Sequence, residues 1–349
     1  MNNGVRRPLT RRALLARASI TGAALVAGPG LKTTPANAAP PLVLGEGTHR
    51  YECIHDFLVP PPNIKWGDTH GLTQDKAGRI YVTHTVHPES PSGDAVVVFG
   101  PDGKFVTSWG ERFRGGGHGI GIRSENGTEY LYHCDIKNRK AVKTTLDGTV
   151  VWERGAPEEA GVYKNGAGFT PTNVAFVPDG DVWIADGYGS SYVHRYGADG
   201  TYKATFGGPG KEAGKFQTPH GAWLDTRGKN PLLAVADRAN RRIQYMDLEG
   251  KHVRFSENGM RLPCNFDVRG DLLLVPDLDS VLTLLDADNK VVVQLGDGYP
   301  SNLRSAPREQ FIPGKFIHPH DAIFLQNGDI LVAEWVPIGR ITLLRKLPG

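Results

Sequence analysis

Six positions in the chain share a short lead-in of Pro, Gly or Thr and a following apolar run, and four of the six are histidines. They are separated by 48, 54, 48, 44 and 56 residues. The positions are His70, His118, Thr172, His220, Cys264 and His320. Neutral imidazoles bind zinc, and three of them leave a tetrahedral ion one open position for a reacting molecule. These residue types therefore suggest metal chemistry, provided that the fold brings the histidines together.

The elements that must position them follow the same repeat. Each unit of roughly 50 residues holds several short apolar runs joined by tight turns, which is typical of a β-propeller blade. The clearest unit, 169–207, has four runs and two Asp-Gly turns, at Asp179-Gly180 and Asp199-Gly200. We expect an all-β fold, a six-bladed propeller. His118, His220 and His320 belong to alternate blades, so they would lie about 120° apart around the axis and converge on it.

The first 38 residues have the features of an export signal. The pair Arg11-Arg12 precedes a weakly apolar run over 18–28, and Ala36-Asn37-Ala38 offers a cleavage site. The run is too short and too rich in Gly and Ala to anchor the protein in a bilayer. We expect 1–38 to be a twin-arginine export signal and 39–349 to be the propeller. The mature protein would then be periplasmic or secreted and free of the membrane.

The charge and the cysteine content limit the classes of partner that we expect for the protein. The formal net charge is +3, but six of the 40 basic side chains lie in 1–38, which holds no acidic residue, so the remainder has 34 basic against 37 acidic groups and a charge of −3. Such a charge balance lacks the excess of basic residues that is typical of nucleic-acid-binding proteins. Three cysteines, Cys53, Cys134 and Cys264, allow at most one disulfide. We expect a monomer whose partner is a small molecule or peptide substrate.

Two segments outside the repeats have distinct expected roles. The sixth unit, 316–347, reaches only three strands before the sequence ends, whereas 51–59 is strand-like and precedes the first unit. We expect 51–59 to pair with the last blade and close the ring, which removes an open sheet edge. The insert 298–313 is rich in Pro, Ser and Arg, and we expect it to be a loop.

Several motifs in the repeats carry a family resemblance. They are Phe169-Thr170-Pro171-Thr172-Asn173-Val174-Ala175, Ala185-Asp186-Gly187-Tyr188, Phe216-Gln217-Thr218-Pro219-His220, Val235-Ala236-Asp237-Arg238-Ala239-Asn240, His318-Pro319-His320-Asp321 and Gly117-His118-Gly119. In order and spacing they resemble the NHL-type six-bladed propellers of peptidylglycine α-hydroxyglycine amidating lyases. The resemblance is densest over 169–245 and covers most of 39–349.

The resemblance implies site residues. Zinc in that family is held by three histidines of alternate blades, which correspond to His118, His220 and His320. The catalytic tyrosine corresponds to Tyr188, and one of two catalytic arginines to Arg238.

A structural calcium on the axis is also implied by the resemblance. Its ligands would be Asp321, which follows the last zinc histidine, and backbone carbonyls, of which that of Ile120 is the local counterpart.

The sequence departs from the family at three places. Trp66 stands where the second catalytic arginine would be, Gly189 replaces a cysteine after the tyrosine, and His70 is an additional ring histidine. Without that arginine we expect weak activity on α-hydroxyglycine peptides and better activity on a substrate that lacks a terminal carboxylate. For His70, contact with substrate, support of a metal ligand and a structural role remain open.

Several of these residues also have interpretations without a role in catalysis or metal binding. Ring histidines can be satisfied polar groups beside a water-filled channel, and Tyr188 can be a loop aromatic packed on a neighbouring blade. For Tyr188, a nearby dication and Arg238 would both lower the phenol pKa, as a general base requires. Cys264 is interpreted as a buried filler. An acidic residue recurs after the second strand of successive repeats, which indicates a structural role; these residues are Asp186, Asp237, Asp277 and Glu334.

Two classes of function follow. The first is a zinc-dependent lyase that cleaves the C–N bond of an α-hydroxy amide, with a metal-dependent hydrolase acting on another small substrate as a related alternative. The second is a non-catalytic NHL propeller that serves as a binding module. Three axial histidines beside an Asp-Gly-Tyr turn favour the enzyme, because a scaffold needs no such group.

Overall fold

The computed structural model describes Met1 and residues 40–164 and 168–348. It divides into two units, Met1–Pro40 and Pro41–Gly349. The predicted export signal, apart from Met1, lies outside the described residues. In the described part, no helix has both the length and the apolar character needed to cross a membrane.

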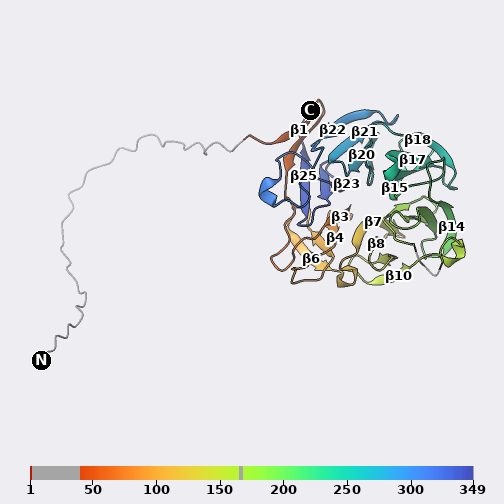
Figure 1. Ribbon diagram of the computed structural model, residues 1–349, viewed down its shortest axis with the longest axis horizontal. Coiled ribbons are helices and arrows are strands. Elements are labelled where there is room, and N and C mark those ends of the chain that lie inside the picture. Colours follow the sequence, from red (N-terminus) through yellow and green to blue (C-terminus); the bar gives the residue numbers. More distant parts are fainter. Residues whose placement is uncertain (2–39, 165–167, 349) are drawn as a thin grey trace. The chain divides into compact units, whose positions relative to one another are not determined.

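The second unit is nearly all β and forms a six-bladed propeller, as the repeat predicted (Figure 1). Each blade is one antiparallel sheet. Blade 1 holds β3 (Thr69–Gln74), β4 (Ile80–His84), β5 (Val96–Phe99) and β6 (Phe105–Trp109). Blade 2 holds β7 (Gly117–Glu125), β8 (Thr128–Asp135), β9 (Lys140–Thr144) and β10 (Val150–Arg154). Blade 3 holds β11 (Asn173–Phe176), β12 (Val182–Ala185), β13 (Tyr192–Tyr196) and β14 (Tyr202–Gly207).

The remaining blades continue the series. Blade 4 holds β15 (Pro219–Asp225), β16 (Leu232–Asp237), β17 (Arg242–Met246) and β18 (His252–Ser256). Blade 5 holds β19 (Asp267–Arg269), β20 (Leu272–Asp277), β21 (Val281–Leu285) and β22 (Val291–Leu295). Blade 6 holds β23 (Pro319–Phe324), β24 (Ile330–Glu334), β25 (Arg340–Lys346), β2 (His49–Ile54) and β1 (Val43–Glu46). Short 3-10 helices follow some strands: η1 (Glu111–Phe113), η2 (Glu158–Ala160), η3 (Arg238–Asn240) and η4 (Arg308–Gln310).

The ring closes through its N-terminal strands. β2 pairs antiparallel with β25, from Tyr51 opposite Lys346 to Ile54 opposite Leu343, and β1 pairs with the outer edge of β2. The predicted closure by the segment before the first repeat is therefore present. Its strand spans His49–Ile54 rather than 51–59, and β1 was not expected from the sequence.

The apolar core lies between blades. Six buried clusters each combine side chains from two neighbouring blades, so every sheet has both faces covered. Some middle strands are consequently buried along their whole length, as in β5 and β21. Full burial of one aliphatic side chain contributes about 1.5–3 kcal/mol. This packing holds the blades in a fixed angular order and so fixes the inner strands around the axis.

The inner strands carry the ring positions. They are β3, β7, β11, β15, β19 and β23, and four of them begin with a histidine at their first or second residue. Thr172 directly precedes β11, and Cys264 lies shortly before β19. The six ring positions thus meet at one end of the axial channel.

Candidate metal centre

Four histidines converge at this end of the channel. His70, His118, His220 and His320 are at most 3% exposed. The ring centroids of His320 lie 4.7 Å from those of His118 and of His220, and the latter two are 5.1 Å apart. The repeat in the sequence therefore does bring the three predicted zinc ligands side by side.

One hydrogen bond from each of these three histidines reaches the neighbouring blade. The pairs are His118 Nδ1 with the Thr172 carbonyl at 2.8 Å, His220 Nδ1 with the Cys264 carbonyl at 2.9 Å, and His320 Nδ1 with the His70 carbonyl at 3.1 Å. A carbonyl only accepts, so the proton is on Nδ1 in each ring. The Nε2 lone pair is left for another partner, an arrangement typical of histidines that bind a metal.

Glycines make these bonds possible. A Cβ on Gly119 would overlap the Thr172 carbonyl, and a Cβ on Gly221 would overlap the Cys264 carbonyl. These are the oxygens that accept from His118 and His220. The His-Gly pairs in the sequence therefore reflect close approach of one inner strand to the next, which a side chain would prevent.

Burial keeps the imidazoles neutral. Desolvation lowers the pKa of His118 to about 3, with Arg238 adding to the shift. It also lowers the pKa values of His220 and His320 well below the usual value, and neighbouring histidines and Arg238 lower them further. Neutral imidazole is the form that binds metal ions.

The ligand atoms fall into two overlapping groups. Nitrogen and sulfur atoms lie within 4.8 Å of one another in the group His70, His118 and His320 and in the group His220, Cys264 and His320. His320 is common to both. Of the three predicted zinc ligands, His118 belongs to the first group and His220 to the second. The Tyr188 hydroxyl lies between these two histidines, 3.0 Å from His220 Nε2 and 3.4 Å from His118 Nε2.

Tyr188 and Arg238 meet over the ring. Tyr188 comes from the turn after β12, and Arg238 is the first residue of η3 after β16. Arg238 Nη1 donates to the Tyr188 hydroxyl at 3.4 Å, and its guanidinium carbon is 5.2 Å from the phenol ring centroid. Tyr188 is 40% exposed, and its hydroxyl faces His220 and His118. Both residues therefore face the candidate metal position.

Burial and Arg238 act in opposite directions on the pKa of Tyr188. Burial of the hydroxyl raises it, and Arg238 opposes this by charge and by hydrogen bonding. Among the protein groups burial is the larger effect, so the net direction is upward. Residue types alone reveal the charge of Arg238 but not the burial that outweighs it.

His70 contacts a predicted ligand directly. Its Nδ1 lies 3.3 Å from His320 Nε2, and its ring centroid is 4.5 Å from that of His118. The sequence left contact with substrate, support of a metal ligand and a structural role open for His70. In the structure its ring nitrogen also lies close enough to His118 and His320 to be a potential ligand itself, a role that was not expected. Cys264 is fully buried, its thiol is 3.9 Å from Arg238 Nη1, and burial raises its pKa to about 12.

Asp321, the predicted calcium ligand, is buried below the histidines. Its carboxylate accepts from Leu72 N at 2.8 Å, Asn265 Nδ2 at 2.7 Å and Ala322 N at 2.9 Å. Desolvation raises its pKa to about 7. Ile120, whose carbonyl was the second expected calcium ligand, is paired opposite His133 in blade 2 and lines the same channel. Three N–H donors therefore already fix the carboxylate.

Two of the three departures from the family pattern have structural reasons. Trp66 is 8% exposed and packs edge-on against His84 at 4.8 Å between ring centroids, so it belongs to the blade 6 and blade 1 core. A Cβ on Gly189 would overlap the Asp186 carboxylate and the Gly168 carbonyl. This turn has no room for a cysteine.

Sequence reasoning missed Arg304, which comes from the 298–313 insert. Its Nη2 pairs with Asp68 Oδ1 at 2.6 Å, and its guanidinium carbon is 3.6 Å from the ring centroid of Trp335. Its Nε is buried without an acceptor among the described residues. Asp68 is two residues before His70, and the Arg304 charge contributes, after desolvation, to the lowered pKa of His70. Loops outside a repeat give no periodic signal, so only the structure shows this second guanidinium.

Each of the recurring acidic residues binds the segment that leads into its own blade. Asp186 accepts from Thr170 N and Ser190 N, both at 2.6 Å, and from the Tyr163 hydroxyl at 2.8 Å. The others also accept backbone N–H groups from the segment before their blade: Asp237 from Gln217, Asp277 from Leu262 and Glu334 from Ile317. These bonds agree with the structural role that the recurrence indicated.

Known proteins resemble the chain at low identity. It is 26% identical over 334 residues to peptidyl-alpha-hydroxyglycine alpha-amidating lyase 1 of Drosophila melanogaster, covering 82% of this chain and 58% of that protein. It is 24% identical to the probable amidating lyase pgal-1 of Caenorhabditis elegans, over 82% of this chain and 85% of that protein. It is 29% identical over 159 residues to human NHL repeat-containing protein 3, over 44% of this chain and 45% of that protein. The chain thus spans about half the length of two of these relatives.

Solved structures support the fold. Virginiamycin B lyase from Staphylococcus aureus superposes with a TM-score of 0.54 at 14% identity, covering 85% of this chain and 100% of that chain. No protein-family model matches the sequence. The resemblance to NHL propellers and amidating lyases is therefore confirmed.

Proposed function

We propose that the protein is a zinc-dependent lyase that cleaves the C–N bond of an α-hydroxy amide to give an amide and an aldehyde. One observation carries the proposal. Three converging histidines have Nδ1 fixed on carbonyls, and two of them, His118 and His220, place Nε2 within 3.4 Å of the Tyr188 hydroxyl, which Arg238 also contacts. Two relatives named as amidating lyases match 82% of the chain. A non-catalytic binding module would not require the three histidines, Tyr188 and Arg238 to converge.

The residues fit zinc. Three neutral imidazoles are a common zinc donor set, and the hydrogen bond on the far nitrogen of each is the usual support for such ligands. His118, His220 and His320 would hold the ion, with His70 close enough to replace or assist one of them. When bound, zinc supplies a dipositive charge that polarises the substrate hydroxyl and lowers the pKa of the phenol beside it.

The chain's own groups account for the proton transfers. Tyr188, as phenolate, takes the proton of the substrate hydroxyl while the carbon–oxygen bond becomes a carbonyl. The electron pair of the breaking C–N bond moves to nitrogen, which accepts a proton from Tyr188. Arg238 stabilises the phenolate and the negative charge that develops on the substrate, because its guanidinium lies on the Tyr188 hydroxyl. Atoms and electrons balance without an oxidant.

The substrate class follows from the two guanidinium groups. Trp66 predicted a preference for substrates without a carboxylate, but Trp66 is in the core, and Arg304 brings a second cation beside His70. Arginines favour carboxylates as ligands. We therefore include α-hydroxyglycine peptides, which end in a carboxylate, among the proposed substrates.

The test is an assay of glyoxylate release from a peptidyl α-hydroxyglycine, combined with metal analysis of the purified protein. We expect about one zinc per chain and turnover that chelation abolishes. His220→Ala should lose most of the metal, and full metal content in that variant would disprove the site. Zinc with no lyase activity but hydrolysis of ester or amide substrates would favour the hydrolase instead. A metal-free protein without turnover would favour the binding module.

A further inference from the structure

The four ring histidines form two triangles that share one side. The shared pair is His118 and His320, whose ring centroids are 4.7 Å apart. His70 lies 4.5 Å from each of them, whereas His220 lies 5.1 Å from His118 and 4.7 Å from His320. The triangle that contains His70 is therefore the tighter one, and its three ligand nitrogens all lie within 4.8 Å of one another.

The proton on His320 limits what the ring of His70 can do. His320 Nδ1 donates to the backbone carbonyl of His70 at 3.1 Å, so the neutral ring of His320 has a lone pair and no proton on Nε2. His70 Nδ1 lies 3.3 Å from that Nε2 atom. Two facing lone pairs would repel each other. In a chain without metal, His70 therefore carries its proton on Nδ1 and donates it to His320.

An ion bound by His320 cannot leave this hydrogen bond intact. The lone pair on His320 Nε2 would bind the ion, and a proton on His70 Nδ1 would then point toward a dipositive charge. Among the described residues, the ring of His70 makes its side-chain hydrogen bond through Nδ1 alone, so Nε2 is free to take that proton. The result is a neutral imidazole with a lone pair on Nδ1, which is a form that binds metal ions.

The spacing of the two rings fits shared coordination. Two nitrogens that bind one zinc ion at about 2.0–2.1 Å with a tetrahedral angle between them lie about 3.3–3.4 Å apart. The distance of 3.3 Å between His70 Nδ1 and His320 Nε2 agrees with this separation. The two atoms therefore already have the spacing of two ligands of one ion.

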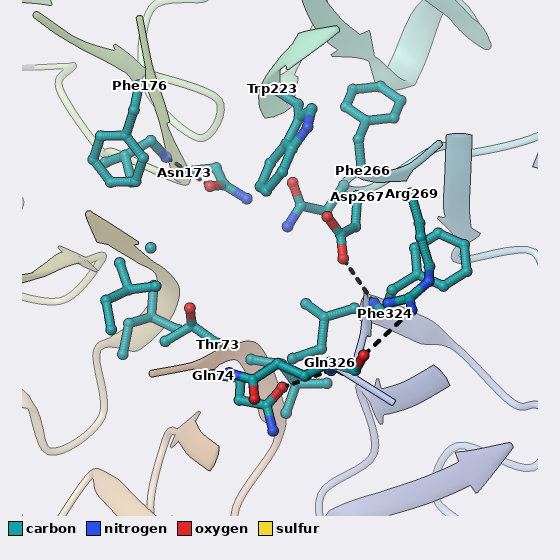
Figure 2. A pocket seen from close by; sticks show the side chains of 17 residues that line it. Thr73, Gln74, Asn173, Phe176, Trp223, Phe266, Asp267, Arg269, Phe324 and Gln326 are labelled. Carbon is teal, nitrogen blue, oxygen red and sulfur yellow. Dashed lines mark hydrogen bonds between the residues drawn. The ribbon is translucent and has the colours of Figure 1, made fainter. Parts of the chain in front are cut away.

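Other parts of the channel do not compete for His70. Further along the axis lies a cavity of about 340 Å³, whose lining includes Gln74 and Trp223 (Figure 2). None of the four histidines belongs to that lining. Cys264 is the other ring position with a ligand atom, but its thiol lies 3.9 Å from Arg238 Nη1. The fixed charge of that arginine opposes a dipositive ion at the sulfur, so His70 is the better additional ligand.

We propose that His70 is a metal ligand through Nδ1, together with His118 and His320. The proposal rests on the proposed function only in that the ring holds a metal ion, and it depends neither on the reaction nor on His220. It has a distinct signature, one imidazole bound through Nδ1. The three histidines with Nδ1 on a carbonyl can bind an ion only through Nε2.

The direct test is long-range proton–nitrogen NMR of the imidazole rings in the full chain, freed of metal with a chelator and then loaded with zinc. We expect the proton of His70 to move from Nδ1 to Nε2 on loading, while His118 and His320 keep theirs on Nδ1. The Nδ1-bound imidazole is recognised in the wild type without any variant. Zinc bound only through Nε2 atoms would overturn this proposal and leave the lyase site intact, whereas a chain that binds no zinc would overturn both.

Zinc affinity gives a second measurement. His70→Gln removes the ring but keeps the backbone carbonyl that supports His320. Its affinity should fall by more than the roughly 100-fold that loss of a supporting partner can cause. Cys264→Ala, at the ring position of blade 5, is the matched control and should bind zinc as the wild type does. Competition with a chromogenic chelator measures both variants. Wild-type affinity in His70→Gln, or loss of zinc in Cys264→Ala alone, would overturn the proposal.

Discussion

Tyr188 carries the sharpest expectation at the scale of single residues. Its hydroxyl lies 3.0 Å from His220 Nε2, and in the described part of the chain no other phenol bonds to His70, His118, His220 or His320. Tyr188→Phe should keep its metal and its KM but lose about 10²–10⁴-fold in kcat, the usual contribution of a general base. Steady-state kinetics with metal analysis check this. Wild-type turnover in the variant would remove the phenol from the mechanism.

The glycines beside the histidines test how the ligands are oriented. Gly221→Ala should displace the Cys264 carbonyl and break its bond with His220 Nδ1, because no space exists for the added methyl group. We expect zinc affinity to fall about 10–100-fold, as when partners of ligating histidines are removed. Gly155→Ala is the control, since nothing lies within 4 Å of a Cβ there. Competition with a chromogenic chelator measures both, and equal affinities would contradict the expectation.

A substitution of Arg304 distinguishes between a substrate with a terminal carboxylate and one without it. If its guanidinium holds a carboxylate, Arg304→Met should raise KM for an α-hydroxyglycine peptide about tenfold with little change in kcat, since a charged hydrogen bond is worth about 1.5–3 kcal/mol. A substrate whose carboxylate is replaced by an amide should be unaffected. A wild-type preference for the neutral substrate would instead support the expectation drawn from Trp66.

The repeat explains which contacts of the candidate site could be predicted from the sequence and which could not. His118, His220 and His320 were identifiable because they recur at one point of a repeat, and recurrence fixes position around an axis. The insertion of the Tyr188 hydroxyl between two of them, and the pairing of Arg304 with Asp68, depend on loop paths that follow no period.

At the scale of elements, the closing strands permit a graded test. Removing residues through Gly47 deletes β1, which pairs only with β2, whereas removing residues through Ile54 also exposes the edge of β25. The larger deletion also removes Tyr51, which is 1% exposed, and should destabilise by at least about 3–5 kcal/mol. Thermal or denaturant unfolding compares the two. Similar stability of both truncated proteins would mean that β2 does not close the ring.

Most blades were predictable because three or four apolar runs separated by Asp-Gly turns leave little choice of register. β19 was not, since Asp267–Arg269 is short and polar. β1 was missed because it covers an edge without belonging to any repeat.

At the scale of the whole molecule, the export signal remains a prediction, since residues 2–39 lie outside the described part. Replacing Arg11 and Arg12 by lysine should keep the protein in the cytoplasm at its full, unprocessed length, because the arginine pair is the recognised feature. Fractionation with mass measurement checks this, and a double substitution of Arg6 and Arg7 is the matched control. Normal export of the lysine variant would assign targeting to another feature.

The bond from His320 to the His70 carbonyl joins the last blade to the first, and so adds to the pairing of β2 with β25 that completes the circle. An ion held by His118, His220 and His320 would also connect three points of the chain that are 102 and 100 residues apart. In thermodynamic terms it would act as a cross-link, because the metal site is lost when the chain unfolds. Loss of zinc should then appear not only as lost turnover but as a ring that opens at its seam, with hydrogen exchange rising first in β2 and β25.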